Sequence, residues 1–156
     1  MIKQLTVISL WLAMFSVNAD NNLNKVKGEA IINISGEAYR LSLQKCYQAT
    51  NTVEGKTVEA FIIATHQSRK SKEPGHRFTA LGSKTSDKAK GSYRLQLGGG
   101  FLNGGTEFSG KIPYDSFSDN KLVFKGKSNS IKRKNKEVIK RVVPIEINVT
   151  CFKSAN

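Results

Sequence analysis

Alternation of apolar and polar side chains near the end of the chain is the strongest structural signal in this sequence. The alternating apolar positions are Val143, Ile145, Ile147, Val149 and Cys151. A period of two places such residues on one face of a β-strand, against a core. The segment 139–152 is therefore expected to be a half-buried strand with Cys151 facing inward. Pro144 lacks an N–H, which predicts an edge or a bend there.

Shorter segments with the same β character precede this strand. They are residues 30–34, 38–44, 58–64, 78–81, 93–97, 106–112 and 121–125. Turn sequences such as Ser35-Gly36 and Glu54-Gly55 separate several of them. No stretch shows the 3.6-residue apolar period of an amphipathic helix. We expect one all-β domain over residues 20–156, built as an antiparallel β-sandwich or a partly closed barrel.

The first 19 residues resemble a secretory signal peptide. Lys3 is followed by a predominantly apolar run, Leu5 to Phe15, and then by the small-residue pattern Val17-Asn18-Ala19. The alternative is a membrane anchor, but spanning a bilayer takes about 20 apolar residues and this run is shorter. We expect cleavage after Ala19 and a soluble periplasmic or secreted product.

Export makes the two cysteines interpretable. Cys46 and Cys151 are the only cysteines, and exported compartments are oxidising. An even pair there predicts one disulfide between an early strand and the last strand. The alternative, a catalytic or metal-binding pair, lacks a CxxC spacing and a histidine near either cysteine in the sequence.

The strand before Cys46, the segment 121–127 and the C-terminal sequence Ile145-Glu146-Ile147-Asn148-Val149-Thr150-Cys151 form a frame. This frame resembles the mycobacterial 19-kilodalton lipoprotein antigen family. The resemblance implies a small β-rich surface domain without known catalysis, in which Cys46 and Cys151 are bonded. The chain departs from that family in lacking the lipid-attachment cysteine and in being strongly basic.

Positive charge is the main functional signal. The chain has 25 Lys+Arg against 12 Asp+Glu, a formal net charge of +13. Much of the excess lies in residues 125–141, which hold one acid, Glu137, and eight cations. The cations are Lys125, Lys127, Lys132, Arg133, Lys134, Lys136, Lys140 and Arg141. We expect this segment to form a flexible tip between the last two strands and to attract polyanions. The alternative is a solvated tip that only aids solubility.

A second cationic segment, residues 67–77, contains Arg69, Lys70, Lys72 and Arg77. His66 lies just before this segment and His76 lies near its end. Two histidines alone are too few for a metal site, which normally has three or four protein ligands. Glu73 is the acid nearest to the two histidines in the sequence. Ion pairing with its basic neighbours is the simpler explanation for its presence.

Other catalytic or ligand-binding patterns are incomplete. The sequence has neither a nucleophile-elbow motif nor HExxH. Glycines between Gly98 and Gly105 have phosphate-loop-like spacing but no following GK[ST], so strand bulges explain them better. Asp115 and Asp119 lack the spacing of a calcium loop, and a polar turn is the expected structure.

The sequence thus predicts a non-enzymatic exported binding module without a cofactor. Its candidate targets are lipopolysaccharide phosphates, acidic polysaccharide, anionic lipid head groups and extracellular DNA. Aromatic residues do not interleave with the basic run, which argues against dedicated nucleic-acid recognition. The alternative is an inhibitor or accessory protein that docks a loop, Gly98–Gly105 or Arg69–Arg77, into a protein partner. An enzyme with an unfamiliar site is a third hypothesis.

Overall fold

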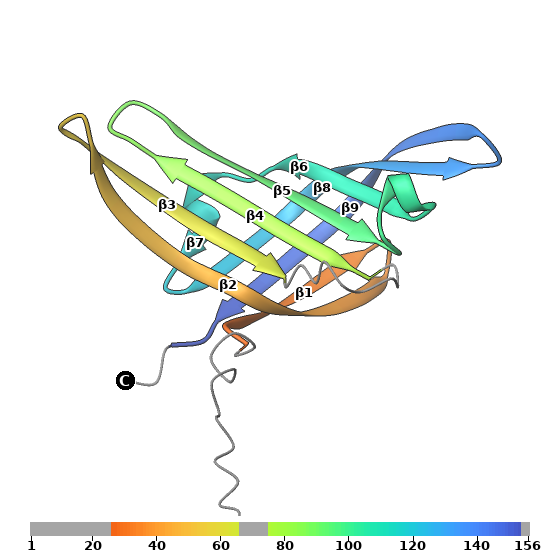
Figure 1. Cartoon of the computed structure of the whole chain (residues 1–156), viewed down its shortest axis with the longest axis horizontal. Coiled ribbons are helices and arrows are strands. Elements are labelled where there is room, and N and C mark those ends of the chain that lie inside the picture. The colour runs from red at the N-terminus through yellow and green to blue at the C-terminus, as the bar shows by residue number, and fades with distance from the viewer. Residues whose placement is uncertain (1–25, 66–74, 154–156) are drawn as a thin grey trace, which may run out of the picture.

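The computed structural model describes residues 26–65 and 75–153, and within them the chain is almost entirely β (Figure 1). The strands are β1 (Gly28–Ile34), β2 (Glu37–Val53), β3 (Lys56–Thr65), β4 (Arg77–Lys84), β5 (Ala89–Leu97), β6 (Thr106–Lys111), β7 (Phe117–Ser118), β8 (Lys121–Lys134) and β9 (Glu137–Cys151). Two 3-10 helices, η1 (Phe101–Asn103) and η2 (Tyr114–Ser116), connect β5 to β6 and β6 to β7. The all-β prediction is confirmed. The expected signal peptide, residues 1–19, lies outside the described residues.

All of these strands belong to one antiparallel sheet, ordered β6-β5-β4-β3-β2-β1-β9-β8-β7. Residues 129–132 of β8 also pair with residues 106–109 of β6. This extra pairing curls the sheet back on itself into a partial ring, and the two halves of the sheet face each other (Figure 1). The structure is therefore close to both predicted architectures: it is sandwich-like in its facing halves and partly ring-like, without being a barrel.

The core lies between the facing halves and is built by strand alternation. In β1, Ala30, Ile32 and Ile34 are buried, while the residues between them are only partly buried. In β9, the predicted inward set is confirmed, because Ile145, Ile147 and Val149 are at most 2 % exposed. Complete burial of such an aliphatic side chain contributes about 1.5–3 kcal/mol. The other buried apolar residues are Leu41, Leu43, Phe61, Ile63, Phe78, Ala80, Tyr93, Leu95, Phe108, Ile112, Tyr114, Phe117 and Leu122.

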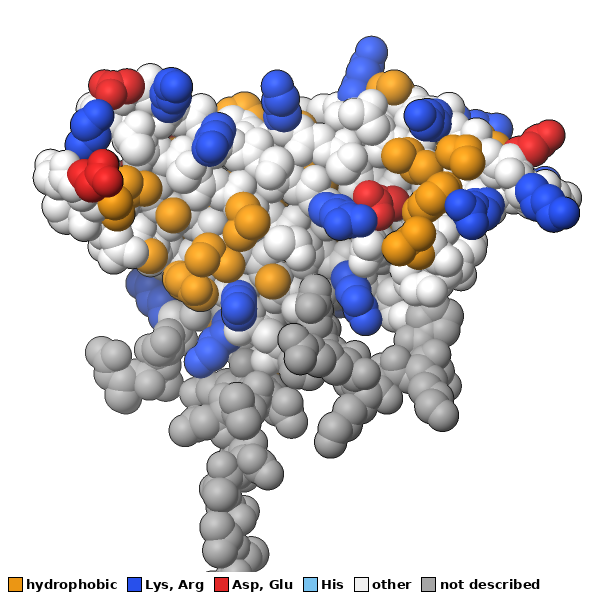
Figure 2. Space-filling view, turned by 45° about the horizontal axis from the view of Figure 1, so that its top comes forward, with side chains coloured by type: hydrophobic (Ala, Val, Ile, Leu, Met, Phe, Trp, Pro, Cys, Tyr) orange, Lys and Arg blue, Asp and Glu red, His pale blue; other side chains and the backbone are white. Residues whose placement is uncertain are grey.

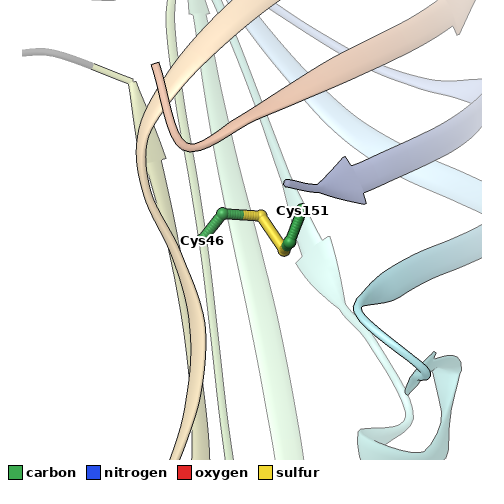
Figure 3. Close-up of a disulfide and its surroundings, with 2 residues drawn as sticks. All are labelled: Cys46 and Cys151. Carbon is green, nitrogen blue, oxygen red and sulfur yellow. A yellow bond between two sulfur atoms is a disulfide. The ribbon is translucent and has the colours of Figure 1, made fainter. Parts of the chain in front are cut away.

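The predicted disulfide between Cys46 and Cys151 is present, with Cα atoms 5.3 Å apart (Figure 3). It joins β2 to β9, the two strands that flank β1. Gly28, the first residue of β1, lies opposite Cys151. A Cβ at Gly28 would lie 2.6 Å from the Thr150 carbonyl oxygen and 3.0 Å from Cys46 Sγ. A residue without a side chain therefore lets the disulfide close over the start of β1.

The basic segment is not the long flexible tip that its composition predicts. β8 continues to Lys134 and β9 begins at Glu137, so only Asn135 and Lys136 form the turn. Both turn residues have positive φ, 48° and 68°, as a tight hairpin turn requires. Composition obscured the strands because a hairpin with solvent on both sides needs no apolar alternation.

Several strand boundaries also extend beyond the predictions. β2 runs to Val53, with a register shift between Leu43 and Lys45. The turns at Ser35-Gly36 and Glu54-Gly55 are confirmed. β1 ends opposite Ile145, so β9 has no partner strand on that side at Pro144, in agreement with the predicted edge.

Candidate anion-binding surface

All eight cations of the basic segment lie on the β8–β9 hairpin, whose turn end projects beyond the body of the sheet (Figure 1). β8 carries Lys125, Lys127, Lys132, Arg133 and Lys134; the turn carries Lys136; and β9 carries Lys140 and Arg141. Figure 2 shows Lys and Arg side chains beside hydrophobic ones at the end of the molecule where this hairpin projects. The structure therefore brings the predicted residues together on one element.

The hairpin divides these cations between its two faces. Ser130 lies opposite Phe108, a buried core residue on β6, and opposite Arg141 on β9. Directly paired residues in an antiparallel sheet share a face, and alternate residues along a strand do so too. Lys132, Lys134 and Arg141 therefore lie on the face that continues from the core. We call this the inner face.

The opposite, outer face holds Lys125, Lys127, Arg133 and Lys140, and Lys136 lies in the turn. A loop interpretation of residues 125–141 hides this division, because the residues of a loop have no common faces. A signal for it does exist in the sequence. The alternation of the last strand, followed backwards from Val143, puts Arg141 and Ile139 on the inner side.

A hollow of about 330 Å³ opens on the inner face, at the end of the partial ring nearest the hairpin. Ile34 and Phe108 are buried lining residues, and Val143 is partly buried. The cations Lys132, Lys134 and Arg141 also line it and are exposed. The remaining lining residues are Ser35, Thr106, Ser130 and Ile139. The hollow thus combines an apolar floor with three positive charges.

None of the eight cations forms an ion pair within the part of the chain that the structure describes. Glu137 lies opposite Lys134, and Glu146 lies opposite Lys125, yet neither acid is within salt-bridge distance of these cations. Glu107 of β6 is engaged elsewhere, because Arg94 donates to its Oε2 at 2.7 Å. This hydrogen bond raises the pKa of Arg94. Close ion pairs among the described residues therefore do not occupy these cations.

One hairpin cation makes a specific contact with the body of the sheet. The guanidinium carbon of Arg133 lies 4.9 Å from the centre of the Phe101 ring. Phe101 belongs to η1, inside the glycine-rich segment Gly98–Gly105. This segment forms a short 3-10 turn, followed by a strand and not by a helix. Leu102, which follows Phe101 in η1, is 84 % exposed.

The histidine positions are only partly described. His66, Glu73 and the cations Arg69, Lys70 and Lys72 lie outside the described residues. His76 supports the glycine-rich segment, because its Nδ1 accepts a hydrogen bond from the Gly98 N–H at 3.2 Å. Its ring also meets Tyr39 edge-on, with the ring centres 5.6 Å apart. His76 thus has a structural contact at this position.

The acidic residues considered for calcium are far from forming a cage. Asp115 lies in η2 and pairs with Lys84 at 3.8 Å, and Asp119 lies in the β7–β8 turn with positive φ. Among the described residues, no three His, Cys, Asp or Glu side chains are grouped as metal ligands. The described part of the chain also contains no helix long and apolar enough to cross a membrane.

Another hollow, of about 890 Å³, lies away from the hairpin. Its charged lining residues are Lys90 and Lys111, and Leu81, Ile112 and Pro113 supply apolar surface. The rest of the lining is Gly82, Ser83, Ala89, Gly91 and Ser92. Among the described residues, no acid, histidine or cysteine lines this hollow.

Comparisons of the chain with protein-family models, with curated proteins and with solved structures found no match. The resemblance to the mycobacterial 19-kilodalton lipoprotein antigen family therefore stays a prediction. Functional inference has to come from the hairpin and its two faces.

Proposed function

We propose that the protein is a non-enzymatic exported binding module that contacts polyanions through the β8–β9 hairpin. One observation carries the proposal: eight cations gather on one hairpin whose turn end projects from the sheet, and none forms an ion pair with a described acid. Such a concentration of unpaired charge attracts anionic polymers and releases their counterions on binding. The candidate partners are an acidic polymer or the anionic surface of a cell envelope.

Export forms part of this proposal. The Cys46–Cys151 disulfide supports it, because disulfides persist mainly in oxidising compartments. The signal peptide proposed for residues 1–19 would deliver the chain to the periplasm or the exterior. The anionic partner would then be one that those compartments offer, such as lipopolysaccharide phosphates or acidic polysaccharide.

Retention on immobilised dextran sulfate tests the proposal. The hairpin variant replaces Lys132, Arg133, Lys134 and Lys136 with Ser. A matched body variant replaces four other exposed lysines with Ser and has the same net charge. These lysines are Lys45, Lys56, Lys88 and Lys90. We expect the hairpin variant to elute at much lower salt than the wild type and the body variant to elute close to it. Equal losses in both variants would overturn the proposal.

A second function is favoured by one observation, the 84 % exposure of Leu102 at the tip of the glycine-rich segment. An exposed apolar side chain on a loop suits an inhibitor or accessory protein that docks this loop into a protein partner. A stoichiometric partner captured from the source extract would support it if Leu102→Asp abolishes capture while the hairpin variant does not. Capture that depends on the hairpin and weakens steeply with salt would contradict it.

A further inference from the structure

The inner face of the hairpin combines cations with apolar core residues in one hollow. Its hollow lies where the core ends and the hairpin begins, so its lining changes character along the strands. Ile34 and Val143 lie at the core end, Phe108 lies level with Arg141, and Lys132 and Lys134 follow toward the turn. The hollow therefore has an apolar end and a cationic end.

The outer face offers no equivalent. A hollow of about 440 Å³ lies there between Asn129, Ile131, Lys140 and Val142, but none of its lining residues is buried. In the inner hollow, Ile34 and Phe108 are only 6 % and 7 % exposed. Only the inner hollow joins the cations to an apolar floor that belongs to the core.

A free inorganic anion would use the cations of the inner hollow and leave its apolar floor against water. An uncharged apolar molecule would cover the floor and leave the cations unmatched. A phosphate head joined to an alkyl chain satisfies both ends. The volume of about 330 Å³ is at the low end for ligand pockets, which suits a head group and the first part of one chain.

We infer that the inner hollow binds a single-chain amphipathic phosphate as a monomer, with its head at Lys132, Lys134 and Arg141 and its chain on Ile34, Phe108 and Val143. This inference rests on the proposed function, since it assigns a ligand class to part of the same hairpin. Ser130 and Thr106, which also line the hollow, supply hydroxyls for the head group. The outer-face cations then serve polymer contact alone.

Calorimetric titration with n-octyl phosphate, kept below its micelle concentration, tests this assignment. The inner variant is Lys132→Ser with Arg141→Ser, and the matched outer variant is Lys127→Ser with Lys140→Ser. Each variant removes one cation from each strand. We expect the inner variant to lose at least about tenfold in affinity and the outer variant to lose less than about twofold. Equal losses would overturn the inference.

Three other probes separate the possible sources of binding. Inorganic phosphate and octyl glucoside test the head and the chain alone, and we expect both to bind far more weakly than octyl phosphate. Equal binding of either one would overturn the inference. So would binding to vesicles of an anionic phospholipid without any binding of monomeric octyl phosphate, because the ligand would then be a membrane surface.

Chemical-shift mapping provides a measurement that needs no variant. Octyl phosphate should shift the methyl signals of Ile34, Ile139 and Val143, and shifts confined to Val138 and Val142 on the outer face would contradict the inference. Dextran sulfate retention reports separately on the proposed function. Retention of the polymer without selective octyl phosphate binding overturns only the inference. Octyl phosphate binding without hairpin-dependent retention overturns only the polymer proposal.

Discussion

The guanidinium of Arg133 lies over the ring of Phe101, 4.9 Å from its centre. This contact links the outer face of the β8–β9 hairpin to η1, close to the place where β8 pairs with β6. Arg133 pairs with Val138 close to the turn, so this cation–π contact holds the turn end of the hairpin against η1.

A double-mutant cycle measures this link. Phe101→Leu and Arg133→Met should each destabilise the fold slightly, with a coupling energy of about 0.5–1 kcal/mol in urea unfolding. Lys132→Met is the matched control, because Lys132 lies on the inner face and should show no coupling to Phe101. The link would be disproved by a coupling that is zero for Arg133 or equal for Arg133 and Lys132.

Gly28 should resist substitution because the chain closes tightly around it. The Cβ of Gly28→Ala would meet the Thr150 carbonyl oxygen at 2.6 Å. We expect a loss of about 1–3 kcal/mol in unfolding free energy, measured by denaturant with the disulfide intact. Gly75→Ala is the control, since nothing lies within 4 Å of its Cβ position. Equal stability of the two variants would contradict the packing described at the disulfide.

Tyr93 carries a buried hydroxyl that has no hydrogen-bond partner, and the residue is only 3 % exposed. Tyr93→Phe removes this unpaired group and should stabilise the protein by about 1 kcal/mol near neutral pH. Tyr47→Phe is the control, because Tyr47 is 44 % exposed and its variant should change stability little. Urea unfolding measures both, and a clear loss of stability in Tyr93→Phe would contradict this account.

The same residue predicts a pH dependence. Burial raises the pKa of Tyr93 above its ordinary value of 10.0. The unfolded chain therefore releases the proton first as pH rises. The part of the folding stability that depends on a protonated Tyr93 is fully present below pH 10.0. It is lost as the pH rises through the raised pKa. Wild type should lose more stability than Tyr93→Phe over that range, and parallel curves would contradict the shift.

The hairpin turn holds Lys136 in a backbone conformation that glycine would adopt with less strain. Lys136 has φ of 68°, a region that costs a residue with a side chain about 1–2 kcal/mol. Lys136→Gly creates the favoured Asn-Gly turn and should stabilise the protein by about 1 kcal/mol. Lys136→Ala removes the same charge without relieving the backbone and should not stabilise it. Thermal unfolding of the pair checks this, and identical melting temperatures would show that the turn is not strained.

Sequence alone predicted the parts of the fold that alternate against the core. The alternation from Val143 to Cys151 predicted which side chains of the last strand point into the core. The two cysteines, together with the expected export, predicted the disulfide. The extent of β8 was not predictable in the same way, because residues 125–134 are largely polar on both faces. The pairing of Ser130 with Phe108 was also hidden, since it depends on how far the whole sheet curls.

Charge density identified the eight cations, but charge density alone did not show their division between two faces. Lys132 and Arg133 are neighbours in the sequence, yet the strand points them to opposite sides. A loop interpretation treats both as one patch. The inner hollow needed Ile34 from β1 and Phe108 from β6, which are remote in sequence from the hairpin.

The most direct test of the central claim is the salt dependence of dextran sulfate affinity. The slope of log K against log salt reports how many cations engage the polymer, at roughly 0.7–0.9 per contact for nucleic acids. We predict that replacing Lys132, Arg133, Lys134 and Lys136 with Ser lowers the slope by up to roughly 3 units. The body variant, with the same net charge, should keep the wild-type slope. An unchanged slope in the hairpin variant, or an equal fall in both, would contradict polyanion binding by the hairpin.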